Sequence, residues 1–149
     1  MKLEKEIHQK KFKSERQKAM INILFTAGWL SERIKQHLKP FELSLPQYNV
    51  LRILNGQYPN PISTSVIRER MLDKMSDTSR IVSRLCQKGL VARGVCSKDK
   101  RLVDVIISEK GQKLIQNIDK HYHELENIME GVNELESQLL NSLLDKIRT

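Results

Sequence analysis

Apolar residues recur every three or four positions over most of this chain, which is the spacing of one buried stripe on an α-helix. The first such stretch predicts one long helix over residues 4–38, and Pro40 marks its end. We expect a second helix to begin at Ser44, because Gln47 three residues later completes a capping box. A third, shorter helix is expected after Ser63. The chain is therefore predicted to be mainly α-helical.

The next helical stretch, residues 76–87, carries Val82 and Leu85 on its apolar stripe. We expect Ser76 to cap its N-terminus. We expect Gly89 to follow its C-terminus, since glycine readily adopts the left-handed conformation that ends many helices. Only a tight turn is expected between this helix and the one before it, as in a helix-turn-helix.

Two short segments rich in β-branched residues follow, at 90–93 and 102–107, and a polar stretch separates them. We expect them to pair as a β-hairpin. After Ser108 the helical spacing returns and runs to the C-terminus, with one interruption at 131–133. The predicted fold class is mainly α with a small β-hairpin, in the order of a winged helix-turn-helix core framed by N- and C-terminal helices.

The outward face of the helix at 76–87 combines short hydroxyl side chains with two arginines. Short hydroxyls permit close approach to a phosphate backbone, and arginine can bond both O6 and N7 of guanine in the major groove of DNA. An ordinary solvated helix face is the alternative interpretation. The candidate DNA-contacting residues of this helix are Ser76, Asp77, Ser79, Arg80, Ser83 and Arg84.

Cations also gather at the tip of the predicted hairpin, which carries Lys98, Lys100 and Arg101. Asp99 is close enough in sequence to brace the guanidinium group of Arg101. A basic hairpin beside a DNA-reading helix suits the phosphates and the narrow minor groove, where negative potential is enhanced. Charged tips are common on exposed hairpins, so it is the position directly after the helix that favours a DNA contact.

The net charge of +8 is unevenly distributed along the 149 residues. Residues 1–18, 19–61 and 62–105 have net charges of +4, +2 and +5, whereas residues 106–149 have a net charge of −3. The basic character therefore belongs to the N-terminal arm and to the proposed DNA-binding unit, while the C-terminal helices are acidic. Such an asymmetry is typical of a surface that binds a polyanion.

Four sequence blocks, taken in order, resemble the core of the MarR family of bacterial transcriptional regulators. LSLPQYNVLRIL at 43–54 resembles the opening of the helix beneath the family's DNA-binding unit, and SRIVSRLCQKGLVAR at 79–93 resembles its recognition helix and first wing strand. DKR at 99–101 is similar to the family's Asp-x-Arg wing, and SEKG at 108–111 to the exit from the wing. Together the blocks cover residues 43–111.

This resemblance implies a single MarR-like domain over residues 1–149, with a winged-helix DNA-binding unit at 43–111 and dimerisation helices at 1–40 and 112–149. It implies a homodimer that binds a pseudo-palindromic double-stranded DNA operator. We expect this dimer to be a repressor that is released from the operator by a small ligand or a stress signal. Arg101 would then be the wing residue that enters the minor groove. A two-fold dimer would place its recognition helices about one turn, roughly 34 Å, apart.

Small-molecule sensing is the commoner mechanism that the resemblance implies, and Trp29, His37 and Tyr48 are candidate walls of a pocket for a small aromatic effector. These rings equally suit core or interface positions, since aromatic side chains fill cores more often than ligand sites. A cysteine-based redox-sensing regulator is a further alternative. Cys96 lies close in sequence to several cations, which favour the reactive thiolate form, whereas Cys86 lies beside the apolar stripe of its helix.

Motifs typical of enzymes are missing from the sequence, which has no CxxC pair, P-loop, GxSxG or HExxH motif. His121 and His123 are two apart on a predicted helix and point to different faces, so they cannot share a metal ion. We therefore predict no catalysis, no metal site and no cofactor. The rival from another class is a winged-helix protein-interaction or architectural module without an operator.

The chain lacks any apolar run that approaches the roughly 20 residues of a membrane helix. Its N-terminus has no apolar region of the kind found in a secretory signal, and only two cysteines are present. We expect a soluble cytoplasmic protein with no membrane partner.

Overall fold

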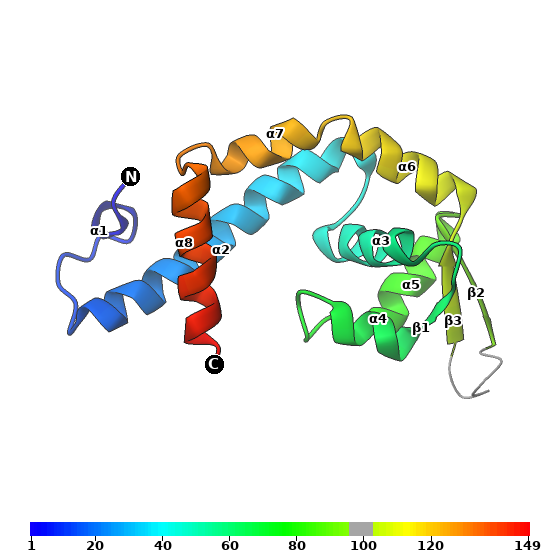
Figure 1. The fold of residues 1–149 in the computed structure, drawn as a ribbon, viewed down its shortest axis with the longest axis horizontal. Coiled ribbons are helices and arrows are strands. Elements are labelled where there is room, and N and C mark those ends of the chain that lie inside the picture. The colour runs from blue at the N-terminus through cyan, green and yellow to red at the C-terminus, as the bar shows by residue number, and fades with distance from the viewer. Residues whose placement is uncertain (96–102) are drawn as a thin grey trace.

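The computed structural model describes residues 1–95 and 103–149, and it shows a long helix that joins an N-terminal arm to a unit of short helices and strands (Figure 1). The helices are α1 (Leu3–Glu6), α2 (Glu15–Leu38), α3 (Leu45–Gln57), α4 (Thr64–Arg70), α5 (Thr78–Gln87), α6 (Glu109–Asp119), α7 (Tyr122–Glu126) and α8 (Glu134–Ile147). The short 3-10 helices are η1 (Lys39–Phe41) and η2 (Asn127–Met129), and the strands are β1 (Ile62–Ser63), β2 (Val91–Val95) and β3 (Val103–Ile107). The predicted fold class is confirmed.

The prediction of one continuous helix over residues 4–38 is wrong. The chain leaves the helical conformation after α1, and His8 has a φ of +53°. Helix α2 then begins anew, because the Ser14 side chain accepts a hydrogen bond from the Gln17 backbone N–H at 3.1 Å. The short arm folds back so that Leu3 is buried.

Helices α3 and α4 begin where the sequence predicts. Ser44 accepts a hydrogen bond from the Gln47 backbone N–H, and the Gln47 side chain accepts one from the Ser44 N–H at 3.1 Å, which completes the capping box. Ser63 caps α4 by accepting a hydrogen bond from the Val66 N–H at 3.3 Å. These caps set the starting points of the first two helices of the predicted winged-helix unit.

The predicted hairpin of β2 and β3 is confirmed at its base, where Val91 pairs with Ile107. The described residues add a strand that the sequence analysis missed. β1 pairs with the other side of β3, with Ile62 opposite Val105, so the antiparallel strands lie in the order β1-β3-β2. A strand of two residues is too short to produce an alternating pattern in the sequence.

Helix α5 has clear caps at both ends, although its N-cap is Asp77 and not Ser76 as predicted. The Asp77 side chain accepts a hydrogen bond from the Arg80 backbone N–H at 3.2 Å. Residues 71–77 separate α4 from α5, so the prediction of a tight turn between them is also wrong. At the other end Gly89 has a φ of +73°, which is the left-handed cap that the sequence predicts.

The hydrophobic core lies among α3, α4, α5, α6 and the sheet. Its fully buried side chains include Val50, Leu51, Leu54, Ile67, Val82, Leu85, Val105, Ile115 and Ile118. Burial of a side chain of this size contributes about 1.5–3 kcal/mol. Val82 and Leu85 therefore hold one face of α5 firmly on the core. Because this face is fixed, the opposite face of the helix is directed to solvent.

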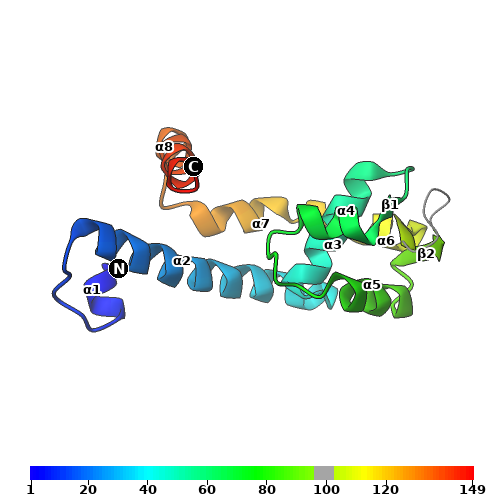
Figure 2. The same ribbon diagram turned by 90° about the horizontal axis from the view of Figure 1, so that it is seen from below.

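Helices α7 and α8 lie outside this core. The predicted interruption at 131–133 is confirmed, but the helical stretch predicted before it has a further break between Asp119 and Tyr122, where α6 ends and α7 begins. Asn133 and Glu136 form the capping box that starts α8, as the sequence predicts. Helices α8 and α2 cross in the view of Figure 1, but Figure 2 shows that they are separated in depth. No residue of α8 is buried within the described single chain.

Candidate nucleic-acid interface

Helix α5 divides into a buried face and a solvent-facing face, as its sequence pattern predicts. The buried side chains are Thr78, Val82 and Leu85. Ser79, Arg80 and Arg84 are exposed on the other side. The helix therefore presents two guanidinium groups and a hydroxyl to solvent on a rigid support. This combination suits contacts with both phosphates and the guanine edge.

Asp77 and Ser76, two of the predicted DNA-contacting residues, take part in hydrogen bonds at the start of α5. The Asp77 carboxylate caps the helix, where the positive end of the helix dipole stabilises its charge. Ser76 is partly buried, and its backbone N–H donates a hydrogen bond to the Asp73 carbonyl oxygen at 3.2 Å. These contacts give both residues a role in positioning the N-terminal end of α5.

Ser83, another predicted contact residue, is linked to the neighbouring strand. Arg93 on β2 donates a hydrogen bond from Nη1 to the Ser83 Oγ at 2.7 Å. Arg93 is exposed, so it adds a third cation beside the outward face of α5. The sequence analysis missed this residue because nothing in its own segment shows that the strand packs beside Ser83.

Two lysines brace the C-terminal end of α5. Lys88 donates through Nζ to the Glu42 carbonyl oxygen, and Lys110 Nζ donates to the Lys88 carbonyl oxygen at 2.9 Å. Cations at this end also interact favourably with the helix dipole. The helix is therefore tied to Glu42, which follows η1, on one side and to α6 on the other, in addition to its contact with the core.

The predicted wing residues follow β2 and precede β3 in the sequence. β2 ends at Val95 and β3 begins at Val103. Lys98, Asp99, Lys100 and Arg101 fall between these strands, as does the candidate redox residue Cys96, and all five lie outside the described residues. The base of the hairpin supports the wing assignment, while the contacts of the tip stay a prediction.

The three aromatic residues predicted to line an effector pocket lie in different surroundings. Trp29 is 42% exposed and lines a cavity of about 200 Å³ with residues of α1, including Leu3. The Arg33 guanidinium carbon lies 5.3 Å from the centroid of the Trp29 ring. Trp29 therefore lies against the N-terminal arm.

His37 lies at the other end of α2, near its junction with α7. Its Nδ1 is 3.7 Å from Glu124 Oε2, and the centroids of the His37 and Phe41 rings are 6.1 Å apart. In the part of the chain that the structure describes, His37 Nε2 is buried without a hydrogen-bond partner. His37 therefore belongs to a packed junction of helices.

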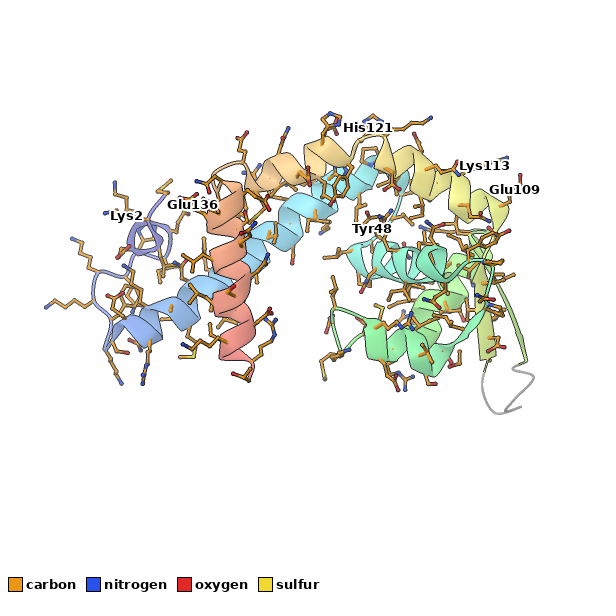
Figure 3. All side chains as sticks on the ribbon, viewed as in Figure 1. Lys2, Tyr48, Glu109, Lys113, His121 and Glu136 are labelled. Atoms are coloured by element: carbon orange, nitrogen blue, oxygen red, sulfur yellow. The ribbon has the colours of Figure 1, made fainter. Side chains whose placement is uncertain are left out.

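Tyr48 is buried on α3, on the side that faces α2 and α6 (Figure 3). The Arg52 guanidinium carbon lies 5.8 Å from the centroid of its ring, and Arg52 Nη1 is 2.7 Å from Asp119 Oδ1. Burial raises the pKa of the Tyr48 hydroxyl above its ordinary value. Tyr48 thus takes part in the contact between α3 and α6.

A larger groove of about 710 Å³ lies between α2 and the start of α3. Its walls include Gly28, Lys35, Leu43 and Pro46, and none of the three predicted aromatic residues lines it. Its volume is in the range of small-molecule sites.

Other chemistry can be assessed for the residues that the structure describes. No group of three His, Cys, Asp or Glu side chains in these residues could hold a metal ion. Cys86 is partly buried and packs against the hydrophobic core. No helix in the described ranges is long and apolar enough to cross a membrane.

Comparison with known proteins identifies the family. The sequence model of the MarR family matches residues 41–102. The chain is 30% identical over 121 residues to the HTH-type transcriptional repressor IacR of Pseudomonas putida, an alignment that covers 80% of this chain and 71% of that protein. The chain therefore belongs to the MarR family, and it is a DNA-binding transcriptional regulator and not an enzyme.

Solved structures support the same fold. A mutant MarR from E. coli complexed with operator DNA superposes with a TM-score of 0.81 at 19% identity, over 93% of this chain and 99% of that one. An organohalide-sensing transcriptional regulator in its 2,4-dichlorophenol-bound form superposes with a TM-score of 0.80 at 19% identity, over 94% of this chain and 85% of that one. At these identities the likeness is one of fold.

Proposed function

We propose that this regulator is a homodimeric repressor that reads a pseudo-palindromic operator with α5 and steadies itself with the wing. The outward face of α5 carries this proposal, because Arg80 and Arg84 are exposed on a helix whose opposite face is anchored by Val82 and Leu85. A recognition helix must present its side chains to base edges without bending away, and this packing meets that need.

The roles on this face can be divided by chemistry. Arg80 and Arg84 bind guanine edges or phosphates, Ser79 allows close approach of the backbone, and Arg93 adds a phosphate contact from β2. Ser83 holds Arg93 in place through their hydrogen bond of 2.7 Å. At the hairpin tip Lys98, Lys100 and Arg101 contact the flanking minor groove.

The homodimer is supported by the apolar side chains that a single chain leaves in solvent. On α2 and α8, large apolar side chains are between 50% and 76% exposed: Met20, Leu24, Leu135, Leu139, Leu143 and Ile147. Helix α8 has no buried residue, and an isolated helix of fewer than about 12–15 residues is marginal in water. A second copy of the chain would bury this stripe and stabilise the helix.

Release by a small aromatic effector is the regulatory part of the proposal. The groove of about 710 Å³ between α2 and α3 adjoins both the dimerisation helix and the DNA-binding unit. A ligand there would change operator affinity if it bound one spacing of the two recognition helices more tightly than another. The likeness to a 2,4-dichlorophenol-bound regulator makes phenols the first compounds to test.

The variant Arg84→Ala tests base reading. If Arg84 binds a guanine edge, the Arg84→Ala variant should lose about 1–3 kcal/mol of binding free energy for the operator and much less for random-sequence DNA. Equal losses on both DNAs would reduce Arg84 to a phosphate contact. Arg148→Ala is the matched control, because it removes the same charge near the C-terminus, where Arg148 pairs with Asp145 at 2.5 Å.

A further inference from the structure

Two large apolar side chains project from the loop that leads into α5. Met75 is 92% exposed and Leu72 is 82% exposed, and among the described residues only Met1 is a more exposed large apolar side chain. The other strongly exposed apolar side chains lie mainly on α2 and α8, where a second copy of the chain would cover them. Dimerisation through those helices does not account for the pair on the loop.

The backbone of this loop is fixed by hydrogen bonds, so the exposure is not that of a loose segment. The Leu72 N–H donates to Asn49 Oδ1 on α3 at 2.9 Å, and the Met75 N–H donates to Asp73 Oδ1 at 2.9 Å. Met71 is buried at the start of the loop and Thr78 at its end. The protein therefore holds the two apolar side chains in solvent at defined positions.

Their surroundings indicate the kind of partner. The exposed charged side chains nearest in sequence are of both signs: the cations Arg70, Lys74 and Arg80, and the carboxylates of Asp73 and Asp77, which accept backbone hydrogen bonds from Met75 and Arg80. It is therefore the position beside α5 that indicates the partner. Met75 lies two residues before the Asp77 cap of α5. It is the N-terminal end of a recognition helix that contacts base edges in helix-turn-helix proteins.

We propose that Met75, with Leu72 beside it, recognises the C5-methyl group of thymine in the major groove of the operator half-site. The methyl group is the apolar feature that thymine presents there, and it distinguishes thymine from cytosine. This inference rests on operator binding through α5. It adds an apolar contribution to specificity beside the hydrogen bonds of the arginines.

The test begins with selection of bound duplexes from a random pool by the full-length protein. In the selected sequence each thymine is then replaced by deoxyuridine, which pairs identically but lacks the methyl group. We expect a loss of about fourfold in affinity at one or more positions per half-site, the size expected for one buried methyl group. Met75→Gln should bind the thymine and deoxyuridine duplexes about equally at those positions, and Leu72→Gln should reduce the difference.

Lys74→Gln is the matched control from the same loop. It removes one positive charge near the DNA, so it should weaken binding to all duplexes to the same extent and leave the thymine preference intact. Because Met75 is 92% exposed, its replacement by Gln should not alter the midpoint of urea unfolding. An unchanged midpoint verifies that the variant is folded.

The outcomes separate this inference from the proposed function. A selected sequence whose thymines can all be replaced without loss overturns the inference alone. A Met75→Gln variant that keeps the thymine preference but forms a weaker dimer than the wild type also overturns it. That result would assign the loop to a contact between protomers. Failure to enrich any sequence overturns operator recognition itself and this inference with it.

Discussion

Replacement of Gly111 by alanine tests how the DNA-binding unit is joined to α6. Gly111 is buried in the first turn of α6, and its N–H donates to Ser108 Oγ at 3.1 Å. A Cβ at this position would overlap the Leu90 carbonyl oxygen and lie 2.7 Å from Ile107 Cγ1. The wing strands and α6 therefore approach each other through the space that the glycine leaves.

The expected cost follows from what can move. The Leu90 carbonyl oxygen accepts a hydrogen bond from the Ser108 N–H at 3.0 Å, so relief of the overlap would weaken that bond. Overpacking typically costs about 1–3 kcal/mol, and alanine returns up to about 1 kcal/mol through its higher helix propensity. We expect Gly111→Ala to lower the free energy of unfolding by about 2 kcal/mol.

The assay is urea unfolding at one fixed protein concentration, because the stability of a dimer depends on concentration. Gly56→Ala in α3 is the matched control. A Cβ there meets no atom within 4 Å, so this variant should gain up to about 1 kcal/mol. A Gly111→Ala protein as stable as the wild type would refute the close approach of α6 to the wing strands.

Three further predictions concern DNA contacts, assembly and pH. Arg101→Ala should weaken operator binding and lower the slope of log affinity against log salt by about one, and an unchanged slope in a salt titration would remove Arg101 from the wing contacts. Leu139→Glu places a charge at a position that is 60% exposed in one chain, so sedimentation should show a folded monomer; an unchanged dimer would exclude this face of α8 from the interface. Tyr48 has a folded-state pKa above the ordinary 10.0, so stability should fall as pH rises above about 10 and the unfolded chain releases this proton first. Tyr48→Phe should make that decline shallower, and a wild-type and variant pair with parallel stability curves would contradict the assignment.

The start or end of several elements could be predicted because one or two residues determine them. Ser44 with Gln47 and Asn133 with Glu136 form capping boxes, and Gly89 ends α5 in the left-handed conformation. Such signals act over three or four residues, and therefore they remain visible without a structure.

The errors arose where several residues could serve equally or where tertiary contacts decide. Ser76 and Asp77 are both good caps, and burial of Thr78 immediately afterwards accompanies the cap at Asp77. The break before Ser14 had a local cap, but the apolar spacing expected of the long helix concealed it. β1 depends on pairing with β3, a contact distant in sequence.

In the candidate site too, features that depend on local sequence could be predicted, and features that depend on tertiary contacts could not. The exposure of Arg80 and Arg84 follows from the helical period of α5, so the sequence could predict it. The Arg93 to Ser83 hydrogen bond and the projection of Met75 depend on how β2 and residues 71–77 pack, which periodicity does not describe. The missed candidates are therefore on strands and loops.

Footprinting of the DNA upstream of the protein's own gene, with random-sequence DNA as competitor, tests operator recognition most directly. We expect one protected region at moderate salt, with two inverted half-sites whose centres lie about one helical turn apart. Protection should disappear in a dimer-deficient variant such as Leu139→Glu. The same region left unprotected, or protection that random DNA removes as readily as specific DNA, would contradict operator recognition by α5.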